Sequence, residues 1–210
     1  MSQKEAGRAA PGQFTGEGGP VISIAGPPGS GKSTLCRALA VRMGHGALIE
    51  YDAYETMTRQ PPNVIEAWLA RGSRYEEIET PGLADALKNA ASKGAVIFET
   101  PLGRAHPTTG PLIDYSVWLS CPDDIALARK IAQFVQSVQS APAGELGQFR
   151  DWLSGYLATY ETVVRPACII QRERVGSQAD LNLDALAPVE ANIAAILENI
   201  ALSYPYCVRR

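Results

Sequence analysis

The chain has 210 residues, of which 46% are hydrophobic and 20% charged, so it can bury a full core in one domain that carries a lid subdomain. The formal net charge is -3 and the Lys and Arg residues are scattered, which argues against a nucleic-acid partner. The four cysteines form no C-x-x-C pair and there are two histidines, so neither a zinc site nor a disulfide framework is expected.

The ends of the chain differ from its middle. Residues 1–19 are polar, rich in Gly, Ala and Gln, and lack an apolar signal-peptide core, so they are predicted to be a disordered leader. No apolar run approaches the length of a membrane span, so we expect a cytoplasmic protein with no membrane contact. Residues 20–203 are expected to form a single domain, followed by a tail at 204–210 whose structure the sequence does not indicate.

The stretch 21–34 reads V-I-S-I-A-G-P-P-G-S-G-K-S-T and carries the most specific signal. A short apolar run ends in a Gly-rich turn that fits G-x-x-x-x-G-K-[ST], and an apolar-periodic helix follows, which is the context that this motif requires. In such a turn, backbone N–H groups and the helix N-terminus surround phosphate oxygens. The lysine reaches the β- and γ-phosphates and the serine hydroxyl ligates Mg²⁺. The alternative is a coincidental Gly-rich turn. The predicted phosphate site comprises Gly26, Pro27, Pro28, Gly29, Ser30, Gly31, Lys32, Ser33 and Thr34.

Acidic residues lie at the ends of the next two predicted strands. The strand at 47–51 is followed by Asp52, and the continuous apolar strand at 95–99 closes on Glu99. Because ligands bind outside the carboxyl ends of parallel strands, both acids should lie near the phosphate loop. Asp52 is a candidate to accept a proton from a substrate hydroxyl or to hold Mg²⁺ through water. Its alternative is a helix N-cap or a surface turn, whereas Glu99 is a candidate second acid near Mg²⁺.

Candidate substrate-binding residues lie in the loops after these strands. Tyr54 follows Asp52 by two residues, and the polar segment 72–79 is a candidate border of the substrate pocket. Arg104 and His106 follow the third strand and are expected to overhang the site. The alternatives are a solvated loop charge for Arg104 and a structural loop histidine for His106.

The remaining strands and helices continue the alternation. We expect a fourth strand at 115–119 and a fifth at 179–183. The expected helices are 32–43, 63–69, one from Thr80-Pro81 to Gly94, one from about 122 to 138, one from 146 that stops before Pro166, and 188–202. This order predicts a three-layer α/β/α fold around a roughly five-stranded parallel sheet.

A helical lid is expected at about 129–150. Arg129 and Lys130 lie on the helix after the fourth strand, where a basic residue of a mobile lid would close over a transferring phosphoryl group. A solvated helix face is the alternative for both residues.

Three further patterns accompany the Gly-rich turn. They are Tyr51-Asp52-Ala53-Tyr54, Ile97-Phe98-Glu99-Thr100-Pro101, and the run Tyr156…Tyr160…Arg165-Pro166…Ala179-Asp180-Leu181. They are similar to an Asp-x-Phe/Tyr after the second strand, to a strand ending in Glu-Gly, and to a Y…R-P…A-D pattern before the last strand. Together with the turn, they resemble the uridine kinase/phosphoribulokinase-like branch of P-loop small-molecule kinases. The resemblance implies a P-loop NTPase fold of the nucleoside/nucleotide-kinase type.

The resemblance also implies an activity, the transfer of the ATP γ-phosphoryl group to a hydroxyl of a small metabolite, with ATP and Mg²⁺ as cofactors. Asp52 would be the general base, and Ser33 and Glu99 would serve the Mg²⁺ shell. Lys32 and Arg129, which matches the family's Ala-Arg run in the lid helix, would complete the catalytic set.

Two departures from the family pattern bear on this reading. The lid run continues as Lys130 and is poor in arginine, so Arg150 and Arg172 are alternative lid cations, and Thr100-Pro101 replaces the usual Gly. Neither a uridine-reading segment nor a phosphoribulose-like anion pocket is recognisable. Two other functions stay open: a nucleotide or sugar-nucleotide kinase with a phosphorylated acceptor, and a nucleotide-binding regulatory ATPase. A homodimer is also left open.

Overall fold

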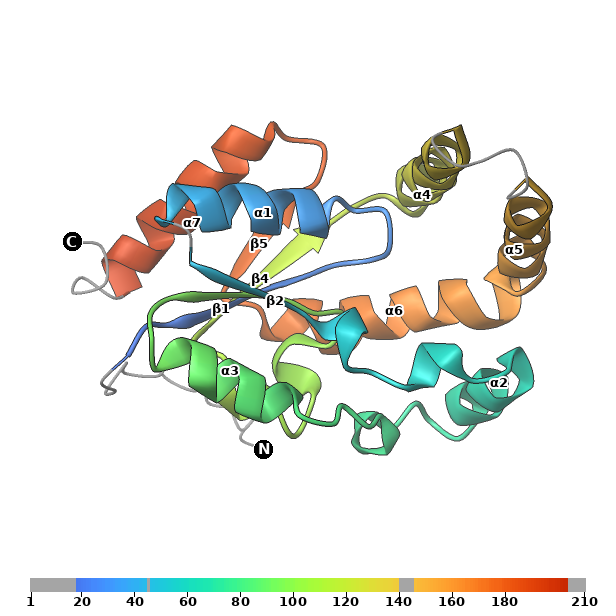
Figure 1. Ribbon diagram of the computed structural model, residues 1–210, viewed down its shortest axis with the longest axis horizontal. Helices are drawn as coiled ribbons and strands as arrows, with labels where there is room; N and C mark the ends of the chain where they lie inside the picture. Colours follow the sequence, from blue (N-terminus) through green and yellow to red (C-terminus); the bar gives the residue numbers. More distant parts are fainter. Residues whose placement is uncertain (1–17, 45, 140–145, 204–210) are drawn as a thin grey trace, which may run out of the picture.

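Five parallel strands form a sheet in the order β2-β3-β1-β4-β5 (Figure 1). The computed structural model describes residues 18–44, 46–139 and 146–203; the predicted tail and, apart from residues 18 and 19, the predicted leader lie outside the described residues. The strands are β1 (Val21–Ala25), β2 (Ala47–Glu50), β3 (Val96–Glu99), β4 (Tyr115–Ser120) and β5 (Leu181–Asp184). The prediction of a five-stranded parallel sheet is confirmed.

Helices cover both faces of this sheet, as Figure 1 shows. Successive residues of β1 alternate between the faces: Ile22 and Ile24 pack in the core beneath α1 and α7, whereas Val21 and Ala25 pack in the core beside α3. The expected three-layer architecture is therefore correct. The helices are α1 (Lys32–Arg42), α2 (Pro62–Ala70), α3 (Leu83–Ala91), α4 (Asp123–Gln139), α5 (Leu146–Ala158), α6 (Arg165–Arg174) and α7 (Val189–Ser203).

The strand register brings the functional loops to one edge. Ile24 of β1 lies beside Glu99 of β3 on one side and Val117 of β4 on the other. The loop after β1 therefore begins next to the residue that ends β3, and β2 pairs with the far side of β3. This placement follows from the parallel pairing, since all carboxyl ends lie at the same edge.

Some element boundaries differ from the predictions. Tyr51 does not end β2 but begins a 3₁₀ turn, Tyr51–Ala53. Strand β5 begins at Leu181 and not at 179, and the carboxylate of the preceding Asp180 accepts a 2.8 Å hydrogen bond from the Ser116 backbone N–H. Helix α3 begins after Gly82, which has φ 78°, and not at Thr80-Pro81.

The prediction that a helix from 146 stops before Pro166 is wrong. Helix α5 ends at Ala158, a π-helical turn covers Tyr160–Val164, and α6 continues from Arg165. Pro166 lies in the first turn of α6, where its missing N–H has no helical partner to lose. The expected lid region 129–150 comprises parts of α4 and α5, and residues 140–145 lie outside the described residues.

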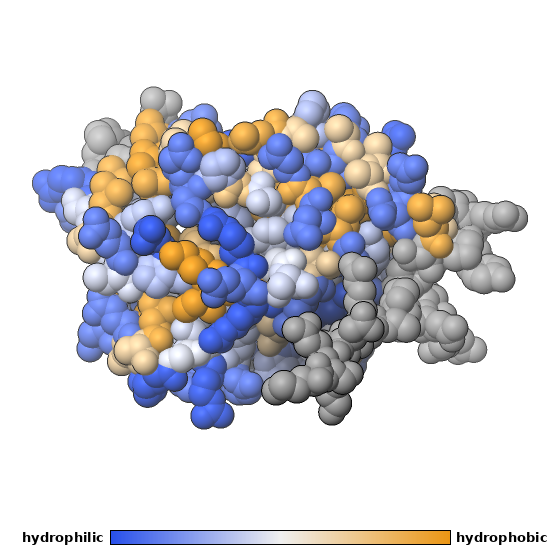
Figure 2. Space-filling view, turned by 180° about the vertical axis from the view of Figure 1, so that it is seen from behind, coloured by the Kyte–Doolittle hydropathy of each residue, from blue (hydrophilic) through white to orange (hydrophobic). Residues whose placement is uncertain are grey.

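In the ranges that the structure describes, every helix is too short or too polar to traverse a bilayer. On the face opposite to that of Figure 1, hydrophobic patches are interspersed with hydrophilic side chains (Figure 2).

Candidate active site

A cavity of about 980 Å³ opens at the carboxyl edge of the sheet. Its upper wall, in the view of Figure 1, comprises the lining residues of α1, α4 and the loop 185–189. Its lower wall comprises the lining residues of 51–78 and 163–171, which come from the segment after β2 and from the π turn and α6. The Gly-rich turn and the end of β3 lie between the two walls.

The Gly-rich turn has the backbone that its sequence predicts. Gly29 and Gly31 have φ values of 83° and 95°, in the left-handed region that favours glycine. A Cβ on Gly29 would lie 2.0 Å from the Ala126 carbonyl oxygen, so the turn also packs closely against the start of α4. Of the nine predicted phosphate-site residues, all but Pro27 line the cavity. The Pro27 carbonyl instead accepts a 3.1 Å hydrogen bond from the Lys32 ammonium.

Four predicted residues come together beside this turn. Ser33 Oγ donates a 2.7 Å hydrogen bond to Oε1 of Glu99. Burial lowers the pKa of Lys32, and the negative charges of Glu99 and Asp52 oppose that shift. The ammonium, the hydroxyl and the two carboxylates thus form one polar cluster between the two walls, at the base of the cavity, which we call its floor.

The donor atoms of this cluster fit a magnesium ion. A serine hydroxyl and carboxylates are hard oxygen ligands, and Mg²⁺ in proteins is held by one or two carboxylates together with phosphate oxygens and waters. Across residues 18–44, 46–139 and 146–203, no group of three or more His, Cys, Asp or Glu side chains is arranged to hold a metal ion. Ser33, Glu99 and Asp52 therefore suit a metal that arrives with its nucleotide better than a permanent metal cage.

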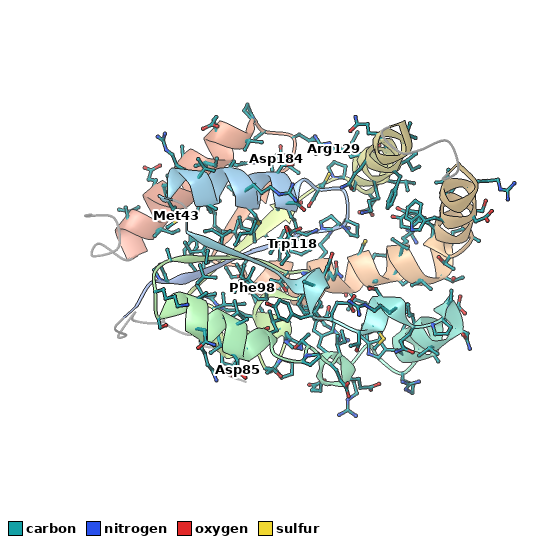
Figure 3. The ribbon with its side chains drawn as sticks, in the orientation of Figure 1. Met43, Asp85, Phe98, Trp118, Arg129 and Asp184 are labelled. Atoms are coloured by element: carbon teal, nitrogen blue, oxygen red, sulfur yellow. The ribbon has the colours of Figure 1, made fainter. Side chains whose placement is uncertain are left out.

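The two basic residues of α4 point to different parts of the cavity. Arg129 Nη1 donates a 3.1 Å hydrogen bond to the Ala185 carbonyl, so its side chain lies over the loop that follows Asp184 (Figure 3). Burial lowers the pKa of Lys130, with Asp52 and Glu99 opposing the shift, so the Lys130 ammonium lies within electrostatic reach of the acids. Neighbouring helical residues are rotated by about 100° around the helix axis, so the two side chains leave α4 in different directions.

The structure therefore changes which cations are candidates. Sequence reasoning favoured Arg129, whereas Lys130 is the α4 residue near the polar cluster. The alternatives are engaged elsewhere: Arg150 pairs with Asp151, and Arg172 pairs with Asp123. In the described part of the chain, neither Arg150 nor Arg172 lines the cavity.

Arg104 and His106 do not overhang the cavity. Arg104 forms an ion pair with Asp180 at 2.7 Å and donates to the carbonyl of Asp114 at 2.6 Å, so it joins the loop after β3 to the start of β5. His106 is 1% exposed, and its ring contacts Thr109 Oγ1 at 2.9 Å. Burial lowers the pKa of His106. His106 thus matches its alternative of a structural loop histidine, whereas Arg104 is a paired structural cation and not the solvated loop charge that was its alternative.

Tyr54 is also absent from the cavity wall among the described residues, and it packs instead against the core beside α3. The segment 72–79 does border the cavity, through Tyr75 and Ile78. Sequence reasoning missed most of the lower wall because its side chains form no motif. Their only signal was the cluster of aromatic and apolar residues around α2. The missed residues are Tyr51, Glu55, Met57, Ile65, Trp68 and Gln171.

Comparison with known proteins supports the assignment of the fold. A family model described as "AAA domain" matches residues 22–133, and no curated protein sequence matches the chain. A shikimate kinase from Acinetobacter baumannii, solved in complex with shikimate, superposes with a TM-score of 0.53 at 17% identity, covering 90% of this chain and 96% of that one. A gluconokinase from Sinorhizobium meliloti gives a TM-score of 0.45 at 18% identity, with 90% and 98% of the two chains covered. At these identities, the shikimate kinase likeness shows a common P-loop fold.

Proposed function

We propose that this chain is a small-molecule kinase. It belongs to the AAA-domain family, whose model matches more than half of its length. It would transfer the γ-phosphoryl group of ATP to a hydroxyl of a small metabolite. The observation that carries the proposal is the position of Asp52 and Glu99. They lie beside Lys32 and Ser33 on the floor of a cavity whose lower wall is free for an acceptor. The narrower uridine kinase/phosphoribulokinase-like resemblance is not needed for it.

The chemistry follows from the roles of these side chains. Phosphoryl transfer needs positioning and charge neutralisation more than covalent catalysis. Backbone N–H groups of residues 26–34 would bind the phosphates, and Lys32 and Lys130 would neutralise the charge that develops on the γ-phosphoryl group. Ser33 and Glu99 would hold Mg²⁺, which when bound neutralises the β- and γ-phosphate oxygens. Asp52 would accept the proton of the attacking hydroxyl.

The nucleoside of ATP would lie along the upper wall. Arg129 and the loop 185–189 line the cavity there, and the hydrogen bond from Arg129 to Ala185 joins them. A base packed against both of them would leave the phosphates directed toward the turn 26–34. The acceptor would then occupy the lower wall, with its hydroxyl near Asp52. This arrangement places donor and acceptor on opposite sides of the transferring group.

An acceptor screen tests the proposal. ATP consumption with Mg²⁺ is measured for the full chain against nucleosides, sugars, pantothenate-like alcohols and nucleoside monophosphates. The expected result is consumption that depends on one hydroxyl compound, is abolished in Lys32→Ala, and falls about 10²- to 10⁴-fold in Asp52→Asn. Full phosphotransfer by Asp52→Asn would contradict the assignment of the base. Nucleotide-dependent binding of a protein partner, without any acceptor turnover, would support the regulatory ATPase instead.

A further inference from the structure

The lower wall of the cavity is mainly apolar. Its lining residues include the side chains of Met57, Ile65, Trp68 and Ile78, and the π turn and α6 add Val163, Val164 and Ala167. Trp68 and Tyr75 stack on each other with an interplanar angle of 21°, and Trp68 Nε1 donates to the Arg74 carbonyl at 3.0 Å. These contacts fix a rigid aromatic surface at the wall. Such a wall favours a ligand that brings an apolar body.

Three polar side-chain atoms of this wall have no hydrogen-bond partner among the described residues. They are the hydroxyl oxygens of Tyr51 and Tyr75 and Oε1 of Gln171, all buried and unpaired within the part of the chain that the structure describes. Tyr51 is 3% and Tyr75 5% exposed. Burial raises the pKa of both tyrosines, that of Tyr75 to about 12, so both hydroxyls remain protonated donors at neutral pH. Buried polar groups in proteins are normally paired, so these three atoms give the wall unused hydrogen-bonding capacity just behind its surface, which a ligand engages when the side chains turn toward the cavity.

Among the residues that the structure describes, no positively charged side chain lines the lower wall: none of its lining residues is Lys, Arg or His. The adjacent Arg174 is engaged, because it donates to the carbonyls of Ser73 at 2.6 Å and Gly72 at 2.8 Å while lying over the Tyr75 ring. The buried Glu55 adds negative charge, and its carboxylate accepts hydrogen bonds from Thr58.

From this wall we infer the chemical class of the acceptor: an uncharged alcohol with an apolar body, whose polar groups bind Tyr51, Tyr75 and Gln171. A carboxylate or phosphate on the part of the acceptor that lies away from Lys32 and Lys130 would be buried near Glu55 with no cation among the described lining residues of this wall, which is strongly unfavourable. The inference rests on the proposed kinase function for the location of the acceptor. It counts against a phosphorylated acceptor and against acids such as the shikimate bound by the structural neighbour.

Matched pairs of compounds test this class. Calorimetry measures binding of methyl shikimate against shikimate and of pantothenol against pantothenate. The full wild-type chain is used with Mg²⁺ and a non-hydrolysable ATP analogue. In at least one pair the neutral member should bind about tenfold or more tightly than the acid. Equal or tighter binding of the acids, or no binding by any neutral member, would overturn the inference.

Point variants locate the binding to the lower wall. Tyr75→Phe should weaken neutral-compound binding by about 3- to 10-fold without lowering the melting temperature, because its hydroxyl has no partner to lose on folding. Tyr54→Phe is the matched control, since Tyr54 does not line the cavity among the described residues, and it should leave binding unchanged. Gln171→Arg should reduce the preference for neutral compounds. Unchanged binding in Tyr75→Phe would contradict the role of this wall.

The two proposals fail in different ways. A neutral compound that binds the wild type, loses affinity in Tyr75→Phe, and is never phosphorylated would leave the acceptor class intact and refute the kinase. Phosphorylation of an acid in preference to its neutral counterpart would support the kinase and refute the acceptor class.

Discussion

The Ser33 hydroxyl donates a 2.7 Å hydrogen bond to Glu99, which joins the first turn of α1 to the end of β3. The contact exists because β3 lies beside β1 in the sheet, although the two residues are far apart in the sequence. Charge on Glu99 also opposes the lowering of the Lys32 pKa. The Glu99 carboxylate therefore accepts the hydrogen bond from Ser33 and also favours the protonated form of Lys32.

Glu99→Gln should raise the Mg²⁺ concentration needed for half-maximal activity and lower kcat/KM by about 10- to 100-fold. The amide oxygen can still accept the Ser33 hydrogen bond, so the melting temperature should change little. The measurement is a Mg²⁺ titration of phosphotransfer beside a thermal melt. Glu77→Gln is the control, because Glu77 forms a surface ion pair with Arg71 outside the cavity. An unchanged Mg²⁺ requirement in Glu99→Gln would remove Glu99 from the metal site.

The two α4 cations should have separable effects. Lys130→Ala should lower kcat by about 100-fold with little change in the KM for ATP, because its charge acts near the acids where the transferring group lies. Arg129→Ala should instead raise the KM for ATP several-fold, because Arg129 lies at the loop 185–189. Steady-state kinetics of both variants, at saturating acceptor, make the comparison. The reverse pattern would restore Arg129 as the residue at the transferring group.

The turn 26–34 and the acids after β2 and β3 could be predicted because each depends on local sequence or on the edge of a parallel sheet. The motif itself specifies its backbone, as the φ values of Gly29 and Gly31 show. Asp52 lies two residues after β2 and Glu99 ends β3, and parallel strands bring their carboxyl ends to one edge. The positions of the turn and of the two acids could therefore be predicted without knowledge of any long-range side-chain contact.

The lower wall and the structural roles of Arg104 and His106 could not be predicted in this way. Arg104 is close in sequence to Glu99, yet its partner Asp180 is supplied by the segment before β5. The His106 ring contacts the carbonyl of Ile78, which precedes α3 in the sequence, whereas His106 follows it. Gln171 reaches the cavity because α6 continues beyond Pro166. Such pairings depend on tertiary packing, which residue spacing does not encode.

Two glycines of the turn should differ in their response to alanine. Gly31→Ala meets no atom within 4 Å and should cost about 1–2 kcal/mol, from the left-handed backbone alone. Gly29→Ala places a Cβ 2.0 Å from the Ala126 carbonyl oxygen, so it should destabilise the protein further and weaken ATP binding as the turn shifts. Denaturant unfolding and nucleotide titration of both variants give the comparison. Equal losses in the two would show that the contact with α4 is relaxed at little cost.

His106 should make the protein sensitive to acid. Burial lowers the pKa of His106 below its ordinary value of 6.5, so the unfolded chain binds a proton at a pH where the folded protein does not. The free energy of unfolding should therefore fall as the pH drops below about 6.5, by at most about 1.4 kcal/mol per pH unit for this one group.

His106→Asn should lose this dependence, while kcat per folded molecule at neutral pH stays near that of the wild type, because His106 is behind the cavity wall. Urea unfolding between pH 5 and pH 8, with activity assayed in parallel, separates the two effects (about 1.5 pH units on either side of the ordinary value). An activity loss without any change in the pH dependence of stability would return His106 to the site.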